Sequence, residues 1–332
     1  MSDPLFARGR RRVCLGLLAG AGLPALRPAH AQPQVQARPA AARLRPRIET
    51  SAQQVRFGRL ERWLSPPSRF VAPRPVEVWL PPGYDGRRPH AVLYMHDGQM
   101  LFDPAATWNR QAWQLDQVAA PLLAAGQLRD FIVVAPWNNG ALRHAEYYPQ
   151  GFLDHLQPPA LRERFVREAL AGRPLADDYL RFLVEELKPA IDAHYATAPG
   201  RDSSFLMGSS MGGLISVYGL CRHPEVFGAA AALSTHWIGI HQRNEALPAA
   251  ALAWLAQHLP APQSSRLYMD RGTEELDALY DEAQDRVDAL MRAQGFAPPG
   301  WISRVYPGAG HKEQDWQARL DQPLRFLLGT PA

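Results

Sequence analysis

Short runs of consecutive apolar residues recur along the chain, and between them apolar residues return at helical spacing. The runs predict strands at 58–64, 76–80, 91–95, 131–135, 204–207, 229–233, 266–269 and 302–306. Runs without polar alternation, such as Ala91–Met95, are typical of strands buried on both faces. Helices are expected at 177–195, 280–294 and 316–328. This alternation predicts an α/β fold with a mostly parallel sheet, helices on both faces and antiparallel strands at the N-terminal edge.

The first 31 residues have the pattern of an export signal. The cluster Arg10-Arg11-Arg12 precedes the apolar run Val13–Leu26, and Ala29-His30-Ala31 offers small residues at a cleavage site. The adjacent arginines resemble a twin-arginine signal, with general secretion or an uncleaved membrane anchor as alternatives. Residues 32–48, rich in Pro, Ala and Gln, are predicted to be a flexible tether. Residues 49–332 are predicted to form a single domain with an insertion around 148–176.

The predicted signal also accounts for the charge of the chain. Residues 1–31 carry a net charge of +4, which equals the formal net charge of all 332 residues. The remainder is close to neutral, so its charge gives no reason to expect a nucleic-acid partner. Of the two cysteines, Cys14 lies in the signal and only Cys221 would remain after cleavage, so no intramolecular disulfide is expected.

The segment Gly208-Ser209-Ser210-Met211-Gly212 follows one predicted strand and precedes an apolar helical stretch. In a G-x-S-x-G turn the central serine lies at a sharp apex, where side chains two residues away would collide. Glycine at both flanking positions removes these collisions, so Ser210 rather than Ser209 is the predicted nucleophile. The amide of Met211 would then be one donor to an oxyanion. The alternative is a Gly/Ser loop with only a packing role.

A serine nucleophile needs a base, and the base in turn needs an orienting acid. His311 follows the last predicted strand in a Gly-rich loop, which we expect to lie beside the loop after the nucleophile strand. The acid belongs between these two residues in the chain, after strand 266–269. Asp277 is our choice, with Glu275 as the alternative; Asp270 ends the strand and would instead pin the turn.

The chain resembles the "Putative esterase" family of α/β-hydrolases, which includes enterochelin esterases, esterase D-type enzymes, feruloyl esterase domains and mycolyltransferases. The resemblance is carried by HDGQMLFD (96–103), TWNRQAW (107–113), the REALAGRPLADDYLRFLVEELKP region, GSSMGG and GAGHKEQDW (308–316). It implies an α/β-hydrolase fold and a serine esterase, with the nucleophile at Ser210 and the base at His311. It also implies a second oxyanion amide in the loop 96–99, at Gln99. It does not decide between Asp277 and Glu275.

Several residues near predicted strand ends are candidates for substrate binding. These are Trp108, Trp137, Trp237 and Arg143, and for each tryptophan the alternative is a place in the core. No metal is expected, because the pair His96-Asp97 lacks an HxH or HExxH companion. No cofactor or nucleotide is expected either, since the chain has no G-x-G-x-x-G or Walker pattern.

Together these patterns predict a periplasmic or secreted serine esterase that acts through a Ser-His-acid triad and an acyl-enzyme. A small-molecule or glycan ester is the expected substrate, and a siderophore, an acetylated or feruloylated glycan and a simple acyl ester all remain open. One alternative is an acyltransferase that moves the acyl group to a sugar or lipid alcohol. Another is a non-catalytic binding protein on a hydrolase scaffold.

Overall fold

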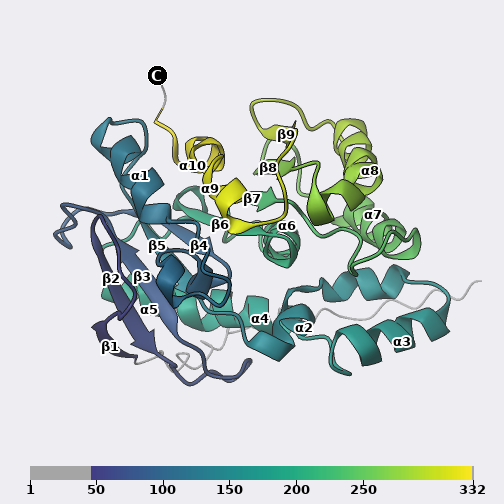
Figure 1. The fold of residues 1–332 in the computed structure, drawn as a ribbon, viewed down its shortest axis with the longest axis horizontal. Helices are drawn as coiled ribbons and strands as arrows, with labels where there is room; N and C mark the ends of the chain where they lie inside the picture. Colours follow the sequence, from purple (N-terminus) through teal and green to yellow (C-terminus); the bar gives the residue numbers. More distant parts are fainter. Residues whose placement is uncertain (1–45, 331–332) are drawn as a thin grey trace, which may run out of the picture. The chain divides into compact units, whose positions relative to one another are not determined.

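A nine-stranded sheet organises the chain (Figure 1), and the computed structural model describes residues 46–330. The order of strands across the sheet is β1-β2-β3-β5-β4-β6-β7-β8-β9. The first three strands pair antiparallel with their neighbours, and all pairs from β5 to β9 are parallel. The strands are β1 (Arg47–Thr50), β2 (Arg59–Leu64), β3 (Val76–Leu80), β4 (Ala91–Met95), β5 (Phe131–Pro136), β6 (Ser204–Ser209), β7 (Ala229–Leu233), β8 (Arg266–Arg271) and β9 (Trp301–Val305). The predicted mostly parallel α/β sheet is confirmed.

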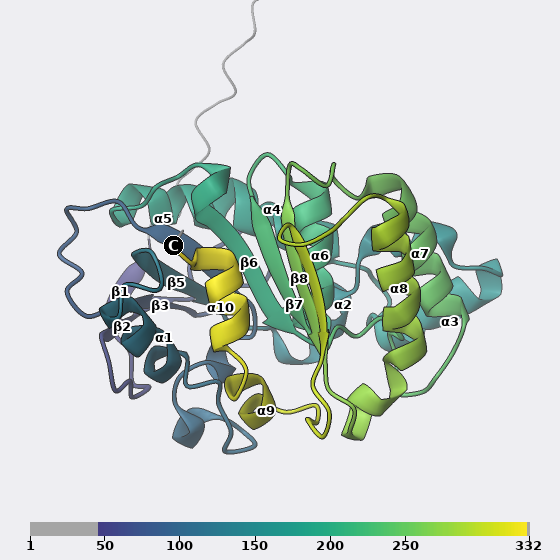
Figure 2. The ribbon, with the colours of Figure 1, turned by 90° about the horizontal axis from the view of Figure 1, so that it is seen from above.

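Both faces of the central parallel strands β4 to β7 are buried, which explains their mostly apolar sequences, whereas the edge strand β9 is partly exposed. In β4, Val92 and Tyr94 point into one hydrophobic cluster, while Leu93 and Met95 point into a second cluster on the opposite face. The first cluster contains residues of α4 (Ala176–Arg181), α5 (Lys188–His194), α6 (Met211–Arg222), α7 (Ala246–His258) and α8 (Asp281–Ala293). The second contains residues of α1 (Leu115–Ala124), α9 (Glu313–Gln317) and α10 (Asp321–Leu328). Figure 2 shows α1, α9 and α10 gathered on one side of the sheet. Apolar burial on two faces therefore holds the sheet between two layers of helices.

Within the described residues, eight helices fall between strands in the chain, and α9 and α10 follow the last strand. They are α1 (Leu115–Ala124), α2 (Arg143–Tyr147), α3 (Pro159–Ala169), α4 (Ala176–Arg181), α5 (Lys188–His194), α6 (Met211–Arg222), α7 (Ala246–His258), α8 (Asp281–Ala293), α9 (Glu313–Gln317) and α10 (Asp321–Leu328). Short 3₁₀ helices lie at Gly98–Met100, Pro104–Ala106, Gly140–Leu142, Gln150–His155, Arg201–Ser203 and Glu275–Leu279.

Two predicted helices differ in detail from those observed. The helix expected at 177–195 contains a π-helical segment, Phe182–Leu187, between α4 and α5. The helix expected at 316–328 is two helices, because the chain breaks between α9 and α10. The turn between them lets Trp316 face the loops at the carboxyl ends of the strands while α10 packs on the sheet.

The predicted domain boundaries can be compared with the structure only in part. The predicted export signal and nearly all of the tether lie outside the described residues. Arg47 and Ile48, which the sequence assigned to the tether, instead belong to β1 and pair with Leu64 and Trp63 of β2. The insertion 148–176 contains a 3₁₀ helix and α3. The ring of Phe152 in this segment packs against Trp254 of α7, with ring centroids 5.6 Å apart. This segment therefore packs on the helix layer.

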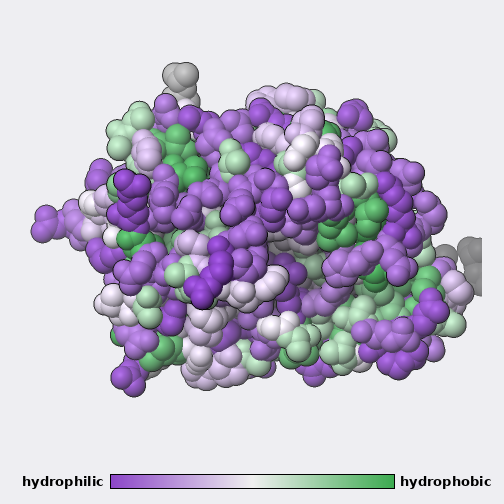
Figure 3. All heavy atoms as spheres, viewed as in Figure 1, coloured by the Kyte–Doolittle hydropathy of each residue, from purple (hydrophilic) through white to green (hydrophobic). Residues whose placement is uncertain are grey.

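Few large apolar side chains reach the surface of residues 46–330. Figure 3 shows a face on which hydrophilic residues predominate and apolar ones form scattered patches. The large hydrophobic residues exposed in this part of the chain are Trp108, at 86%, and Val305, at 49%. No helix within the described range is long and apolar enough to cross a bilayer.

Candidate active site

Ser210 occupies a strained turn between β6 and α6. Its backbone angles are φ 57° and ψ −122°, a conformation that side-chain-bearing residues rarely adopt. A Cβ atom added to Gly208 would lie 2.7 Å from the carbonyl carbon of Gly212, so the turn closes only if residue 208 has no side chain. The N–H of Ser210 donates to the carbonyl of Leu233 at the end of β7, which anchors the turn. Ser209 is the last residue of β6.

His311 reaches the same site by a route that differs from the expectation. β9 is an edge strand, and β7 and β8 separate it from β6, so the two loops do not leave adjacent strands. The loop after β9 folds back over the loop after β8, where the carbonyl of Ala309 accepts the N–H groups of Thr273 and Glu274. Ser210 and His311 line one cavity of about 650 Å³. Among residues 46–330, no hydrogen bond joins their side chains.

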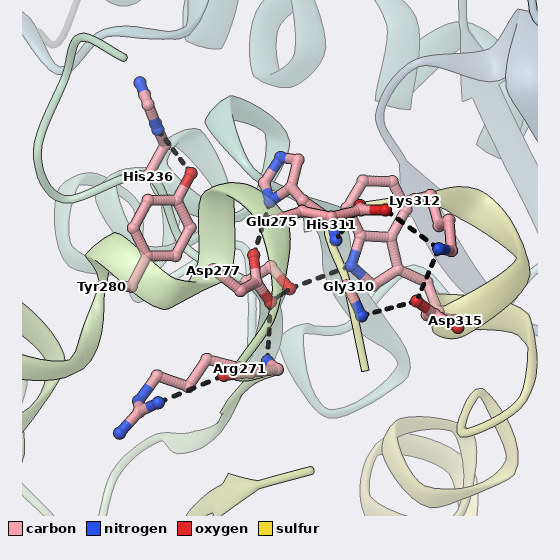
Figure 4. A network of polar contacts seen from close by, with 12 residues as sticks. His236, Arg271, Glu275, Asp277, Tyr280, Gly310, His311, Lys312 and Asp315 are labelled. Atoms are coloured by element: carbon pink, nitrogen blue, oxygen red, sulfur yellow. Dashed lines mark hydrogen bonds and ion pairs between the residues drawn. The ribbon is translucent and has the colours of Figure 1, made fainter. Parts of the chain in front are cut away.

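The imidazole of His311 is bound by Asp277 (Figure 4). Its Nδ1 lies 2.6 Å from Oδ1 of this carboxylate, which is fully buried. The other carboxylate oxygen accepts the Ser234 hydroxyl at 2.5 Å and the backbone N–H of Gly272 at 2.6 Å. Because Asp277 can only accept hydrogen bonds when ionised, it holds the proton of His311 on Nδ1 and leaves Nε2 as the basic nitrogen.

The other acidic candidates have different contacts. Glu275 is exposed, and it accepts the backbone N–H of His311 at 2.9 Å and pairs with Lys312 at 3.0 Å (Figure 4). It therefore shapes the loop and does not contact the imidazole. Asp270 is buried at the end of β8, where it forms an ion pair with Arg319 at 3.0 Å.

Sequence reasoning missed a group of residues beneath Asp277. The hydroxyl of Ser234 accepts hydrogen bonds from Trp316 Nε1 at 2.9 Å and from Arg319 Nη2 at 3.1 Å, and it donates to Asp277. Arg319 also bonds Asp270, so the network ties the end of β8 to α9 and the turn that follows it. One signal could have suggested it: Ser234 directly follows the strand next to the nucleophile strand. Its partners are distant in sequence and carry no comparable signal.

The sequence predicts two backbone amides, those of Gln99 and Met211, as oxyanion donors. Within the described residues, the N–H groups of Gln99 and Met211 donate to no acceptor. Met211 is the first residue of α6, where the helix dipole favours negative charge. The loop containing Gln99 packs tightly on β5, since a Cβ on Gly98 would lie 2.1 Å from the carbonyl oxygen of Ala135. The Gln99 side chain accepts the N–H of Asn138 at 3.1 Å, which fixes the loop further.

Arg143 contributes to the site through Asp97. Its guanidinium forms two hydrogen bonds of 2.7 Å with this carboxylate, and both residues line the cavity. Burial would raise the pKa of Asp97, but Arg143 outweighs it and the pKa is lowered, so Asp97 stays ionised. The pair therefore forms a rigid polar wall. Burial lowers the pKa of the neighbouring His96 to about 4, which keeps that imidazole neutral.

The three predicted substrate-binding tryptophans have different surroundings. Trp108 lines the cavity mouth and is highly exposed. Trp237 is 1% exposed and donates to Gln284 at 2.8 Å, so it belongs to the core and does not contact the cavity. Trp137 lies under the guanidinium of Arg62, outside the cavity lining. Trp113 and Trp316, which stack on each other and line the cavity, were not predicted as binding residues.

The sequence raises the pair His96-Asp97 as a possible metal site, and Asp97 lines the cavity. Within residues 46–330, no group of three or more His, Cys, Asp or Glu side chains is arranged to hold a metal ion. His96 instead contacts the hydroxyl of Tyr179 through Nδ1 at 2.8 Å. Asp97 is occupied by Arg143 and by Asn138.

Known proteins share both sequence and fold with this chain. The model of the family described as "Putative esterase" matches residues 68–327. The uncharacterized protein YbbA of Bacillus subtilis (strain 168) is 23% identical over 266 residues, which covers 77% of this chain and 93% of YbbA.

Solved structures of esterases have a similar fold. An enterobactin esterase from Shigella flexneri gives a TM-score of 0.58 at 19% identity, covering 83% of this chain and 60% of that one. This chain thus spans about 60% of the length of that enzyme. A ferulic acid esterase from Anaeromyces mucronatus gives a TM-score of 0.56 at 20% identity, covering 84% of this chain and 92% of that one. Because the family model matches most of the chain and the fold agrees with it, this protein belongs to the Esterase family of α/β-hydrolases.

Proposed function

We propose that the protein hydrolyses a carboxylic ester with Ser210 as nucleophile, His311 as base and Asp277 as orienting acid. The observation that carries the proposal is the shared cavity. One wall presents a serine at a strained strand-to-helix turn, and another presents an imidazole whose Nδ1 lies 2.6 Å from a buried carboxylate. Nucleophile, base and orienting acid are the minimum set for acyl transfer through a serine.

Each group has a defined part in the reaction. Ser210 Oγ attacks the ester carbonyl as Nε2 of His311 takes its proton, and the same proton is then donated to the leaving alcohol. The charge on the tetrahedral oxygen is stabilised by the amides of Met211 and Gln99, whose N–H groups are unoccupied within the described residues. Water, activated by His311, then releases the acid and restores the serine.

The role of Ser210 is tested by replacing it with alanine. Hydrolysis of p-nitrophenyl acetate should fall by at least about 10³-fold, because only binding and oxyanion stabilisation would remain. A fluorophosphonate probe should label the wild-type protein at position 210 and leave Ser210→Ala unlabelled. Undiminished hydrolysis by the variant would rule the mechanism out. A wild-type protein that neither hydrolyses esters nor binds the probe would favour a binding protein.

The cavity favours a substrate with both polar and aromatic or sugar-like parts. Asp97, Asn138 and Arg143 line one side, while the exposed Trp108 offers a ring face at the mouth. The structurally similar proteins include an enterobactin esterase and a ferulic acid esterase. Substrates of these two kinds have the polar and aromatic parts that such a cavity could accommodate. We therefore expect a siderophore ester or an acylated glycan to be turned over faster than a simple acetate ester.

A substrate panel tests this expectation. It compares a catecholate siderophore ester, a feruloylated glycan, an acetylated glycan and p-nitrophenyl acetate, with kcat/KM as the readout. Adding a sugar alcohol to the same reactions measures transfer against hydrolysis. An acylated alcohol as the main product would identify an acyltransferase. Equal kcat/KM for all four esters would contradict the assigned substrate class.

We infer export from the arginine and apolar pattern of residues 1–31. Expression of the full chain with a C-terminal tag, followed by cell fractionation and N-terminal sequencing, tests this location. Cleavage after Ala31 and recovery outside the cytoplasm are expected. An intact N-terminus in the cytoplasmic fraction would contradict it.

A further inference from the structure

Ser234 has a strained backbone directly after β7. Its φ is 45°, in the left-handed region that favours glycine, and the residue is completely buried. Its backbone N–H donates to the carbonyl of Asp270 at 2.7 Å, which anchors it to β8. Backbone conformation alone would favour glycine at this position. The strained serine therefore directs attention to its hydroxyl.

The direction of the Ser234 hydroxyl hydrogen follows from its neighbours. The oxygen accepts the indole N–H of Trp316 at 2.9 Å and a guanidinium N–H of Arg319 at 3.1 Å. Both of these groups can only donate, so neither can receive the hydroxyl hydrogen. The acceptor that this hydroxyl has within residues 46–330 is Oδ2 of Asp277, 2.5 Å away. The hydroxyl hydrogen is therefore directed at that carboxylate.

Arg319 orients the hydroxyl while its own charge is balanced elsewhere. Its guanidinium contacts both carboxylate oxygens of Asp270, at 3.0 and 3.3 Å. Arg319 is 4% exposed and Asp270 is fully buried, so water screens this ion pair little. Because Asp270 occupies the guanidinium, the Asp277 carboxylate is left to pair with His311 (Figure 4).

The Asp277 carboxylate is held by three donors. Its Oδ2 accepts the Ser234 hydroxyl and the Gly272 amide, and its Oδ1 lies 2.6 Å from Nδ1 of His311. The last torsion of an aspartate side chain is soft, so a carboxylate with fewer contacts can turn. The hydroxyl from the end of β7 and the amide from the end of β8 together fix its plane.

We propose that Ser234 is a positioning residue of the hydrolytic reaction. Its hydroxyl fixes the Asp277 carboxylate, which in turn holds the imidazole of His311 in place to accept the proton of Ser210. The inference rests on the proposed serine mechanism. Ser234 is fully buried and is not among the residues that line the catalytic cavity, so it acts through Asp277 and does not contact the substrate.

Two variants remove the hydroxyl but differ in backbone strain. Ser234→Ala keeps the strain, whereas Ser234→Gly relieves it, because glycine adopts a positive φ freely. In both variants, kcat for p-nitrophenyl acetate should fall about 10- to 100-fold, because a misplaced base slows the chemical steps. Since His311 serves both half-reactions, KM should change less than about twofold. The rate constant for fluorophosphonate labelling should fall by the same factor as kcat.

A conservative variant and a matched control accompany these two. Ser234→Cys keeps the side-chain shape with a weaker donor, so its kcat should lie between those of wild type and Ser234→Ala. The control is Ser204→Ala, which deletes a fully buried hydroxyl bonded to the carbonyl of Gly200 at 3.2 Å, at the other end of β6 from the site. It should lower the urea unfolding midpoint and leave kcat and labelling unchanged. Equal losses of kcat in Ser204→Ala and Ser234→Ala would reject the positioning role.

A double-mutant cycle tests whether Ser234 acts through Asp277. In an Asp277→Asn background, Ser234→Ala should reduce kcat by less than about twofold further, because the carboxylate that it positions is already gone. Additive losses would indicate a separate packing role. Proton NMR gives a readout that does not need catalysis. The low-field resonance of Nδ1–H of His311 should be sharp in wild type and in Ser204→Ala, and should shift or broaden in Ser234→Ala.

The outcomes separate the two proposals. If Ser234→Gly hydrolyses the ester and reacts with the probe at wild-type rates while Ser210→Ala is inactive, the role of Ser234 is wrong and the serine mechanism stands. An unchanged Nδ1–H resonance in Ser234→Ala would reject the role of Ser234 in the same way. If Ser210→Ala retains activity, the serine mechanism falls and this inference falls with it.

Discussion

At the scale of single residues, burial separates two carboxylates that the sequence places two positions apart. Both Asp277 and Glu275 contact His311, but Glu275 is exposed and binds its backbone, whereas Asp277 is fully buried and binds its imidazole. The Gly272 amide and Ser234 hydroxyl occupy one oxygen of Asp277, so the other oxygen is directed at Nδ1. A carboxylate held this way can fix the tautomer of the base.

Replacing Asp277 with asparagine should be far more harmful than replacing Glu275 with glutamine. The Asn oxygen would stay with the amide and hydroxyl donors, and its NH₂ would face Nδ1, which stabilises the wrong tautomer of His311. The corresponding change in a serine protease costs about 10⁴-fold in kcat. We expect at least about 10³-fold for Asp277→Asn and less than about threefold for Glu275→Gln, measured as kcat on the same ester. Similar losses in the two variants would reject Asp277 as the acid.

At the scale of elements, the turn between β6 and α6 works only because the strand and the helix approach each other very closely. A side chain at 208 would meet backbone atoms of Gly212, which cannot move without shifting the first turn of α6. Since that turn carries Met211, the nucleophile and one oxyanion amide depend on the same close approach.

Gly208→Ala should therefore damage both stability and activity. We expect a loss of about 1–3 kcal/mol in the free energy of unfolding, as for other overpacked sites, and a fall in kcat of at least about tenfold. Urea unfolding and ester hydrolysis measure the two effects. The control is Gly200→Ala, where an added Cβ meets nothing within 4 Å and φ is −68°. A Gly208→Ala protein as stable and active as this control would contradict the role of the close approach.

At the scale of the whole molecule, buried neutral histidines couple stability to pH. His96 is 2% exposed, and burial lowers its pKa to about 4, despite the opposing charge of Asp97. Between pH 6.5 and 4 the unfolded chain binds a proton at this position that the folded protein does not. Above pH 6.5, the neutral His96 therefore makes its full contribution to the free energy of unfolding. This contribution is lost as the pH falls from 6.5 toward 4.

We expect His96 to lower the free energy of unfolding by about 3 kcal/mol between pH 6.5 and 4. Free energies of unfolding from urea titrations at several pH values measure it for the wild type and for His96→Gln, which has no titrating group. The variant should show a shallower fall in stability, by about that amount, whatever its absolute stability. Parallel curves for the two proteins would show that His96 does not titrate on unfolding.

Several features followed from local patterns alone. The apolar runs located the eight strands β2 to β9 to within a few residues. The signal is clearest in β4, β5 and β7, which are apolar along their whole length because every position is buried. The glycine spacing around Ser210 identified a strained turn, and the family resemblance is confirmed by the match over residues 68–327. The catalytic roles of Ser210, His311 and Asp277 stay predictions until the variants are measured.

What the sequence by itself determined is the eight strands β2 to β9, their order along the chain and the sharp turn at Ser210, since each depends on residues close together in the chain. Only the tertiary structure decided which carboxylate meets His311, that Trp237 belongs to the core, and that Ser234 and Arg319 lie next to that carboxylate. These contacts join residues tens of positions apart, and burial selects among chemically similar candidates. No local pattern contains that information, because burial arises only when the sheet and its two helix layers have packed together.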